Sequence, residues 1–374
     1  ESLMYSKRKV LISTNTSWNL VNFRAGLIKA LVGEGHEVIV AAPRDKYSDR
    51  LADLGCRYVP LPMDNRGTSV MLDILLLWRF VVLMRKETPN IFLGYTVKPN
   101  IYGSVAAKML KVPVINNIAG LGTAFQNQGW LNVLVSFLYK CALSSSHKVF
   151  FQNMGDQDLF LSRGLVKSES TAILPGSGID LQKFAATSMP NGAVFRFLFI
   201  GRLLWEKGVQ EYVEAARILN HRGLDAECCL LGFVDENNPS SITQLQIEAW
   251  VSEGVIQYLG ASDDVREEIA RANCIVLPSF YPEGTPRALL EGAAMARPII
   301  TTDTPGCRNV VDEGCNGFLC WPRDAKDLAE KMQQMMALSA SSLATLGLHS
   351  RSKAEKEFDE RIVIKKYLQA ISSI

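Results

Sequence analysis

Two glutamates placed eight residues apart, Glu283 and Glu291, surround an expected strand-to-helix junction. The apolar run 275–277 predicts a buried strand, Thr285 is a favourable helix N-cap, and Pro286 suits the first helical position. Both carboxylates are therefore expected around one helix N-terminus. Because carboxylates are strong acceptors for neighbouring hydroxyl groups, one can hold a ribose and the other a second sugar.

The backbone at this helix start is expected to bind an anion. Gly284, Thr285 and Arg287 have amide groups that lack partners within the helix, and the helix dipole adds positive potential there. A phosphate on these amides, beside two carboxylates that accept hydroxyl groups, indicates a sugar nucleotide as the ligand. Taken alone, the segment is also compatible with an exposed helix start that carries two solvated acids.

A second strand-loop-helix unit, earlier in the chain, supplies positive charge. Residues 194–200 predict a strand that ends at Gly201, where the backbone can turn tightly, and a helical pattern begins at Val209. Arg202 and Lys207 lie between the two. Arginine chelates phosphate oxygens in a planar fork and lysine acts as a point charge, so the pair could neutralise a diphosphate leaving group.

Apolar strand-like runs alternate with helical stretches along the whole chain. Such alternation favours parallel sheets covered by helices on both faces, with ligands bound beyond the carboxyl ends of the strands. With 374 residues, 48% of them hydrophobic, the chain can build two compact domains. The expected strands are 10–13, 37–41, 91–93, 112–115, 149–151, 197–200, 228–231, 256–259, 275–277 and 299–301.

These motifs resemble family 4 of the glycosyltransferases, retaining enzymes of the GT-B architecture. The resemblance extends over nearly the whole chain, and residues 98–103 and 120–122 are similar more specifically to the branch that extends lipid-linked bacterial glycans. It implies an α/β fold of two Rossmann-like parallel-sheet domains that face each other across a cleft. Further matching segments are 175–180, 231–237, 305–311 and 314–318. The implied domains are an acceptor-binding domain (1–187), a nucleotide-sugar-binding domain (188–355) and a C-terminal helix that returns to the first domain (356–374).

The resemblance also assigns roles to individual residues. It implies that Glu283 contacts the donor sugar, Glu291 contacts the ribose, and Arg202 and Lys207 hold the diphosphate of a UDP-sugar donor, with no further cofactor. In this family the departing phosphate is thought to assist an attack of the acceptor from the same face, which retains configuration. The donor site is completed by Gly201, Gly284, Thr285 and Pro286.

The chain departs from the family pattern in its first half. Many relatives have a glycine-rich loop after the first strand and a histidine after the fifth, whereas residues 14–19 here read Thr-Asn-Thr-Ser-Trp-Asn and residues 116–120 read Asn-Asn-Ile-Ala-Gly. No catalytic histidine is therefore predicted. Asn19, Asn116 or Asn117 can take over contacts to the 6-position of the sugar.

The charge of the chain is distributed unevenly. Residues 1–190 contain 21 Lys and Arg against 13 Asp and Glu, whereas the remainder contains 19 against 25. A basic first half suggests an anionic partner, and the lack of an aromatic-interleaved nucleic-acid motif favours a membrane surface over nucleic acid. A merely solubilising surface is the alternative.

The most hydrophobic stretch of the chain, residues 70–84, is too short for a membrane span and is expected as a buried helix with one edge that could touch lipid. Arg66 precedes it and could meet an acceptor phosphate. Lys98, after the fourth strand, is a second candidate on the acceptor side, the alternative being an ordinary turn lysine.

The cysteines and acidic pairs do not indicate a metal site. Eight cysteines occur without a CxxC pair or a Cys/His cluster, which suits reduced thiols of a cytosolic chain. Asp156 and Asp158 match an Asp-x-Asp metal motif formally, but they lie at an expected helix start, where acids are favourable. Arg202 and Lys207 already provide the positive charge that a metal would bring, so metal-independent transfer is predicted. No signal peptide opens the sequence, which places catalysis on the cytoplasmic side, with peripheral attachment to the inner membrane.

The function predicted from these observations is that of a retaining, metal-independent glycosyltransferase. It moves a hexose or N-acetylhexosamine from a UDP-sugar to a polyprenyl-diphosphate-linked saccharide in bacterial surface-glycan or glycoprotein-glycan assembly. GalNAc is the first candidate for this sugar. A nucleotide-sugar epimerase of the same fold and a non-catalytic sugar-nucleotide binding module are the alternatives. A nicotinamide dehydrogenase is disfavoured because no Gly-x-Gly-x-x-Gly follows any expected strand.

Overall fold

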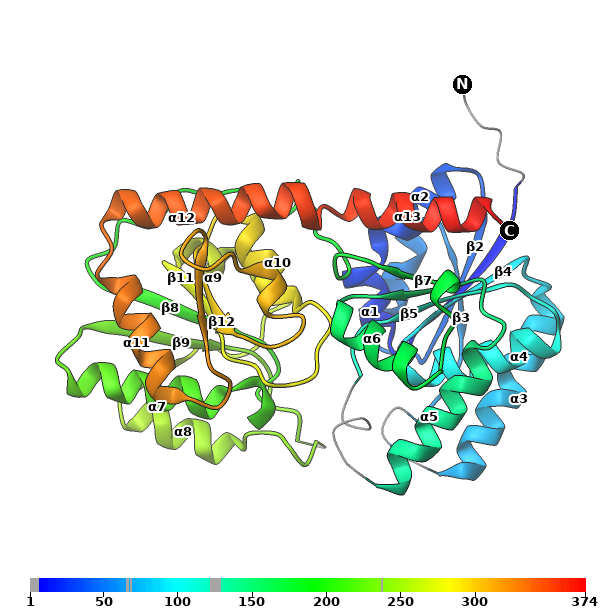
Figure 1. Ribbon diagram of the computed structural model, residues 1–374, viewed down its shortest axis with the longest axis horizontal. Helices are drawn as coiled ribbons and strands as arrows, with labels where there is room; N and C mark the ends of the chain where they lie inside the picture. Colours follow the sequence, from blue (N-terminus) through cyan, green and yellow to red (C-terminus); the bar gives the residue numbers. More distant parts are fainter. Residues whose placement is uncertain (1–6, 65–66, 68, 122–128, 237) are drawn as a thin grey trace. The chain divides into compact units, whose positions relative to one another are not determined.

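The computed structural model describes residues 7–64, 67, 69–121, 129–236 and 238–374 (Figure 1). The chain divides into two compact units. Unit 1 comprises Glu1–Gly178 and Glu360–Ile374, and unit 2 comprises Ile179–Asp359. Each unit contains one parallel β-sheet covered by helices, which confirms the expected α/β class with two parallel sheets.

The sheet of unit 1 has the strand order β3-β2-β1-β4-β5-β6-β7, and all its strand pairs are parallel. Its central strands are apolar and fully buried, because helices cover both faces. The direction of winding reverses between β1 and β4, which makes the carboxyl ends of these two strands the switch point of the sheet. The strands are β1 (Lys9–Ser13), β2 (Glu37–Ala42), β3 (Arg57–Pro60), β4 (Ile91–Tyr95), β5 (Val114–Ile118), β6 (Lys148–Phe151) and β7 (Thr171–Ile173).

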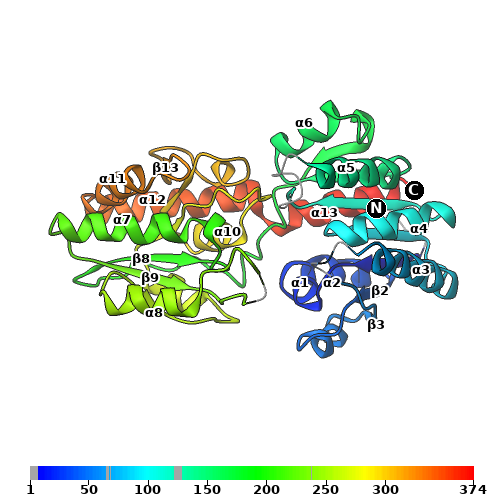
Figure 2. The ribbon, with the colours of Figure 1, turned by 90° about the horizontal axis from the view of Figure 1, so that it is seen from below.

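The helices of unit 1 pack on opposite faces of this sheet. Helices α1, α2 and α13 share one hydrophobic core with the sheet, whereas α3 and α4 pack in another core on the opposite face and α5 continues that side. Figure 2 shows α4 between α3 and α5, in agreement with their contacts. The helices are α1 (Ser17–Phe23), α2 (Ala25–Gly33), α3 (Val70–Glu87), α4 (Ser104–Met109), α5 (Trp130–Leu143), α6 (Met154–Ser162) and α13 (Glu360–Ser372), with the short turns η1 (Ser48–Leu54), η2 (Pro99–Gly103) and η4 (Ser168–Ser170).

The sheet of unit 2 repeats the same topology, in the order β10-β9-β8-β11-β12-β13 with parallel pairs throughout. Its switch point lies between β8 and β11, the two strands that precede the basic and the acidic candidate residues. The strands are β8 (Phe195–Ile200), β9 (Ala226–Leu231), β10 (Gln257–Tyr258), β11 (Cys274–Leu277), β12 (Ile299–Thr302) and β13 (Gly317–Cys320).

The helices of unit 2 also cover both faces of their sheet. In Figure 1, α7 and α8 lie on one side of the strands, and α10 and α12 lie on the other. The helices are α7 (Val209–His221), α8 (Gln244–Ser252), α9 (Arg266–Arg271), α10 (Arg287–Ala294), α11 (Ala325–Met336) and α12 (Ala340–Lys353), with the short turns η5 (Trp205–Lys207), η6 (Arg308–Val310) and η7 (Ala354–Phe358).

The expected start of α10 was wrong by one residue. Pro286, and not Thr285, is the N-cap, and α10 begins at Arg287. Pro286 has an extended backbone, with φ −61° and ψ 126°, so it lies outside the helix although its φ is compatible with it. No side chain caps this helix, which leaves its first amide groups to other partners.

Helix α3 is longer and more exposed than expected. It extends from Val70 to Glu87, and its first turns place several large apolar side chains in solvent instead of burying them. Among the residues that the model describes, no helix is both long and apolar enough to cross a membrane.

Candidate functional site

The loops that follow β8 and β11 contain the predicted donor-site residues, and they meet at the switch point of unit 2. The amide groups of Phe280 and Tyr281 both donate to the carbonyl of Glu206, at 2.9 and 3.0 Å. These two hydrogen bonds join the loop after β11 to the loop after β8. The sheet topology therefore brings together two segments that are far apart in the sequence.

An ion pair between these loops forms the centre of the candidate site. Lys207 Nζ lies 2.6 Å from Glu283 Oε2, and the side chains are only 10% and 12% exposed. The second carboxylate oxygen, Oε1, accepts a hydrogen bond of 2.7 Å from Ser279 Oγ. Both oxygens of Glu283 are thus held, and the carboxylate has a fixed direction.

An aromatic ring supports the two predicted cations. Lys207 Nζ lies 5.3 Å and Arg202 Cζ lies 5.9 Å from the centre of the Tyr281 ring. Positive groups are attracted to the face of an aromatic ring at such distances. Arg202, Lys207 and Glu283 are therefore gathered within one small region around Tyr281, as predicted for residues that act on one ligand.

Two glycines allow this close packing. Gly208 adopts φ +79°, and a Cβ there would lie 2.1 Å from the carbonyl oxygen of Pro278. Gly306 adopts φ +85°, and a Cβ there would lie 1.6 Å from the carbonyl oxygen of Gly284. Since no side chain fits at either position, the loops of Lys207 and of Glu283 can approach their neighbours only with glycine present.

Glu291 lies farther along α10 and has its own cation. Arg287 Nε donates to Glu291 Oε1 over 3.1 Å, four residues apart on one helix face. Burial raises the pKa of Glu291 above its ordinary value, although the positive charges of Arg287 and Lys183 act in the opposite direction. A carboxylate in this position is poorly hydrated, which suits an acceptor for ligand hydroxyl groups.

Sequence reasoning missed Ser279, Tyr281 and the carbonyl of Glu206. Ser279 precedes Glu283 by four residues in an irregular loop, so no periodic pattern links the two side chains. The aromatic pair 280–281 in the loop after the strand was the one available signal, because binding residues occur preferentially in loops. The parallel pairing of β8 with β11 places the two loops that follow these strands side by side.

The candidates of unit 1 are mostly engaged in structural contacts. Lys98 Nζ pairs with Asp73 Oδ1 at 2.7 Å and donates to the carbonyl of Gly67 at 2.9 Å, and Tyr102 donates to the other oxygen of Asp73. Lys98 therefore connects the loop after β4 to the start of α3. Arg66 lies outside the described residues.

The asparagines expected to follow the fifth strand lie within it, because β5 extends to Ile118, and they are buried in a polar network. Asn116 donates to Asn100 Oδ1 and Ser104 Oγ, and Asn117 donates to the hydroxyl of Tyr367 on α13. Neither Asn116 nor Asn117 is exposed at all. They fasten η2, α4 and α13 to the sheet, in keeping with the rule that buried amides are hydrogen-bonded.

Asn19 differs from these asparagines. It lies in the first turn of α1, where its amide donates to the capping hydroxyl of Thr16. Its side-chain oxygen Oδ1 is buried and accepts no hydrogen bond from any described residue. A buried acceptor without a donor is costly, so this oxygen is suited to a ligand hydroxyl group or a water molecule.

The Asp156 segment has a structural role at the start of α6. Asn153 caps α6, and Asp156 is the third residue of that helix and accepts from the Asn153 side chain at 3.0 Å. Burial raises the pKa of Asp156 to about 6. In the described part of the chain, no group of three or more His, Cys, Asp or Glu is arranged to hold a metal ion.

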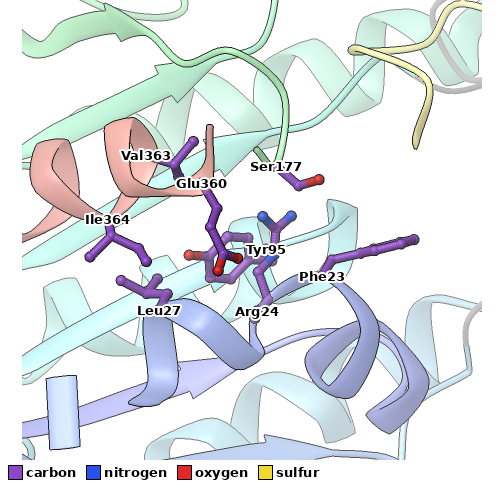
Figure 3. Close-up of a pocket in the computed structure, with 8 residues that line it drawn as sticks. All are labelled: Phe23, Arg24, Leu27, Tyr95, Ser177, Glu360, Val363 and Ile364. Atoms are coloured by element: carbon purple, nitrogen blue, oxygen red, sulfur yellow. The ribbon is translucent and has the colours of Figure 1, made fainter. Parts of the chain in front are cut away.

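A small cavity in unit 1 marks where α13 is attached (Figure 3). The guanidinium of Arg24 lies over the ring of Tyr95, 4.2 Å from its centre. The carboxylate of Glu360, the first residue of α13, packs so closely on Gly26 that a Cβ there would lie 2.5 Å from Oε2. This contact places a negative charge at the start of α2, which is electrostatically favourable.

Comparisons with known proteins identify the class. Residues 9–153 match the family model described as "Glycosyl transferase 4-like", and residues 194–337 match "Glycosyl transferases group 1". Together the two matches cover well over half of the chain, one in each unit. The chain therefore belongs to the glycosyltransferases that combine these two domains.

Similar proteins include two bacterial enzymes. The chain is 28% identical over 368 residues to the N,N'-diacetylbacillosaminyl-diphospho-undecaprenol alpha-1,3-N-acetylgalactosaminyltransferase of Campylobacter jejuni, covering 94% of this chain and 95% of that protein. It is 24% identical over 273 residues to the UDP-Gal:alpha-D-GlcNAc-diphosphoundecaprenol alpha-1,3-galactosyltransferase of Escherichia coli, with 69% of each chain covered.

Solved structures confirm the fold. Alr3699/HepE of Anabaena, solved in complex with UDP and glucose, superposes with a TM-score of 0.81 at 18% identity, covering 98% of this chain and 100% of that chain. Structures of this kind are GT-B glycosyltransferases, and this chain has the same fold.

Proposed function

We propose that this protein is a retaining glycosyltransferase that transfers a hexose or N-acetylhexosamine from a UDP-sugar to a polyprenyl-diphosphate-linked saccharide. GalNAc is the first candidate for the transferred sugar. The reaction belongs to bacterial surface-glycan or glycoprotein-glycan assembly on the inner face of the cytoplasmic membrane, to which the protein attaches peripherally. The names of the Campylobacter and Escherichia relatives, both of which act on diphosphoundecaprenol-linked sugars, support this choice. The UDP bound in the Anabaena structure supports the nucleotide.

The observation that carries the proposal is the Lys207–Glu283 pair at the switch point of unit 2. In doubly wound sheets, ligands bind beyond the carboxyl ends of the strands at this point. Lys207 and Arg202 lie together there, next to a carboxylate that two neighbours hold in place. A diphosphate needs cations, and a sugar needs a directed acceptor for its hydroxyl groups.

We assign the donor contacts as follows. Arg202 and Lys207 bind the diphosphate, together with the backbone amides of Gly284 and Thr285, while Pro286, which has no amide hydrogen, sets the start of α10 beside them. Glu283 accepts from hydroxyl groups of the donor sugar. Glu291 accepts from the ribose. Gly201, the first residue after β8, lets the chain turn beside the diphosphate.

Charge development during the reaction gives these contacts their catalytic effect. The bond between the anomeric carbon and the diphosphate oxygen breaks, the sugar becomes oxocarbenium-like, and negative charge grows on the leaving oxygens. Preorganised cations stabilise that charge in the transition state more than in the ground state. The acceptor oxygen then bonds to the anomeric carbon on the face that UDP leaves, and its proton passes to the departing diphosphate. No protein base is required.

We further propose that Arg202 and Lys207 replace a divalent metal. The site provides two positive groups where the charge develops, so transfer should continue in the presence of EDTA. Strict dependence on magnesium would contradict these roles.

Unit 1 is proposed to bind the acceptor. Asn19 offers a buried oxygen without a donor in the described chain, and it follows β1, at the switch point of the first sheet. Lys98 and Asn117 act there through the positions of the loops they fasten, since their polar groups already have partners.

The test is a donor panel with a short polyprenyl-diphosphate sugar, with products analysed by mass spectrometry. We expect one UDP-sugar to give a disaccharide product and free UDP, and Glu283→Gln to depress turnover. Calorimetry with UDP should show weaker binding for Glu291→Ala. An isomerised donor without free UDP would indicate an epimerase, and nucleotide binding without transfer or hydrolysis would indicate a binding module.

A further inference from the structure

Large apolar side chains are exposed on two helices of unit 1. On α3 the most exposed include Met71 at 77% and Trp78 at 62%, and on α5 they include Trp130 at 73% and Phe137 at 62%. Within each helix these residues recur every three or four positions and so share one face. We call this surface the α3/α5 face; its exposed members are Val70, Met71, Leu72, Ile74, Leu75, Trp78, Val82, Trp130, Val133, Leu134 and Phe137.

The α3/α5 face is separate from the core of unit 1. The opposite side of α3 packs against the sheet through Leu76 and Phe80, and α5 packs inward through Tyr139 and Leu143. A helix at the surface of a soluble domain normally exposes polar residues on its outer side. Large apolar side chains gathered on the outer side of a soluble domain mark an interaction site.

The face lies at one end of the unit. Helices that connect parallel strands run antiparallel to them, so the N-termini of α3 and α5 lie toward the carboxyl edge of the sheet. Figure 1 shows both N-terminal ends at the lower edge of unit 1. The face begins in the first turns of both helices and continues along them to Val82 and Phe137, so its N-terminal part lies at the same edge of the sheet as the start of α1, which contains Asn19.

The surroundings of the face are positively charged. Residues 70–143 contain seven Lys and Arg and two acids, Asp73 and Glu87. Both acids are neutralised within the unit, because Asp73 pairs with Lys98 and Glu87 pairs with Arg57. The exposed cations are Arg85, Lys86, Lys108, Lys111 and Lys140.

We propose that the α3/α5 face inserts into the headgroup region of an anionic lipid bilayer. Apolar side chains with two tryptophans, beside exposed cations, match the amphipathic character of a membrane interface. The choice of lipid as the occupant rests on the proposed function, since a polyprenyl-linked acceptor is itself held in a bilayer. The insertion presents the carboxyl edge of the unit 1 sheet to the headgroups, where such an acceptor carries its diphosphate and sugar.

The test is vesicle flotation of the full chain. Vesicles of phosphatidylethanolamine and phosphatidylglycerol, without any acceptor, should bind the protein, and vesicles of phosphatidylcholine alone should bind it more weakly. In the double variant Trp78→Ser/Phe137→Ser, binding to the anionic vesicles should fall by at least about tenfold. The matched control is Trp321→Ser in unit 2, where a tryptophan with 65% exposure is replaced and binding should not change.

Several results would overturn the proposal. The double variant could bind vesicles as well as the unchanged chain does, or the unchanged chain could fail to bind anionic vesicles. The unchanged chain could also self-associate without lipid, and the double variant could abolish that self-association. Calorimetry with UDP on every variant shows whether unit 2 has folded. Because the vesicles contain no acceptor, their binding is independent of transfer, which is assayed separately with a short, water-soluble polyprenyl-diphosphate sugar. Vesicle binding without transfer would contradict the proposed function and leave the lipid contact standing.

Discussion

The two units have the same strand order around a switch point but place different side chains there. In unit 2 the loops after β8 and β11 carry Arg202 and Glu283, which are half-buried, and Lys207, whose side chain is 10% exposed. In unit 1 the turn after β4 carries Asn100 and the end of β5 itself carries Asn117, and both residues are almost fully buried and hydrogen-bonded to neighbouring groups. The topology decides where loops converge, whereas accessibility decides whether their side chains can meet a ligand.

The difference is also one of chemistry. In a network of buried amides, the polar groups hydrogen-bond to one another, and such a network stabilises the fold. A buried ion pair is expensive to desolvate and is a weaker source of stability. Lys207 and Glu283 are therefore better explained by a polar ligand that uses both charges than by folding.

The largest effect is expected from removing the cation of unit 2. Lys207→Ala should lower the rate of transfer by about 10²–10³-fold, because the growing charge on the diphosphate loses a preorganised partner. The matched control is Lys353→Ala, since Lys353 is also an ion-paired lysine with 10% side-chain exposure but pairs with Asp312 and Glu357 elsewhere in unit 2. Equal loss of transfer in both variants would mean that any buried lysine gives this result.

A substitution of Gly208 should break the geometry of the same site. Gly208→Ala would meet the Pro278 carbonyl at 2.1 Å with φ +79°, and we expect the free energy of unfolding to fall by about 3 kcal/mol or more. Gly223→Ala is the control, because Gly223 has φ +70° and open space, so only the backbone strain of about 1–2 kcal/mol applies. Chemical denaturation measures both, and similar losses would contradict the close approach of the two loops.

The amides of unit 1 should matter for stability and not for the nucleotide. Asn117→Ala removes the buried amide that contacts Tyr367 and Gln152 and should lower the free energy of unfolding by about 1–3 kcal/mol. Binding of UDP, measured by calorimetry, should stay unchanged. A loss of UDP affinity in this variant would remove the distinction between the two switch points.

The smallest expected effect is that of Glu291 on the affinity for UDP and on the pH dependence of this affinity. Glu291→Ala should weaken UDP binding by about tenfold through the loss of hydrogen bonds to a charged group. Because the pKa of Glu291 is raised in the free protein and ribose hydroxyl groups prefer its charged form, binding releases a proton. Affinity should therefore fall as the pH drops through this raised pKa.

Glu291→Gln separates this effect from protonation of the nucleotide phosphate. The variant should bind UDP with a smaller dependence on pH than the unchanged protein. Identical pH profiles for the two proteins would contradict a ribose contact at Glu291.

Much of the fold and part of the site could be predicted from the sequence. Buried central strands are apolar and so appear as continuous runs, whereas β3, β7 and β13 lie at sheet edges, are short, and were missed. Arg202, Lys207 and Glu283 were predictable because each lies in the loop between such a run and the next helix.

The supporting contacts of the site could not be predicted. Ser279 and Tyr281 act through loop conformation, and the approach of Gly306 to Gly284 depends on backbone positions that sequence patterns do not encode. The exposed face of α3 was predicted to be buried, because hydrophobicity alone does not distinguish a side chain of the core from one on an exposed interaction surface.

The most direct test of the central claim is a crystal structure of this protein with UDP bound. The account predicts diphosphate oxygens within about 3 Å of Arg202 and Lys207, and ribose hydroxyl groups on Glu291. UDP bound at the switch point of unit 1, or bound in unit 2 without contact to these side chains, would contradict it.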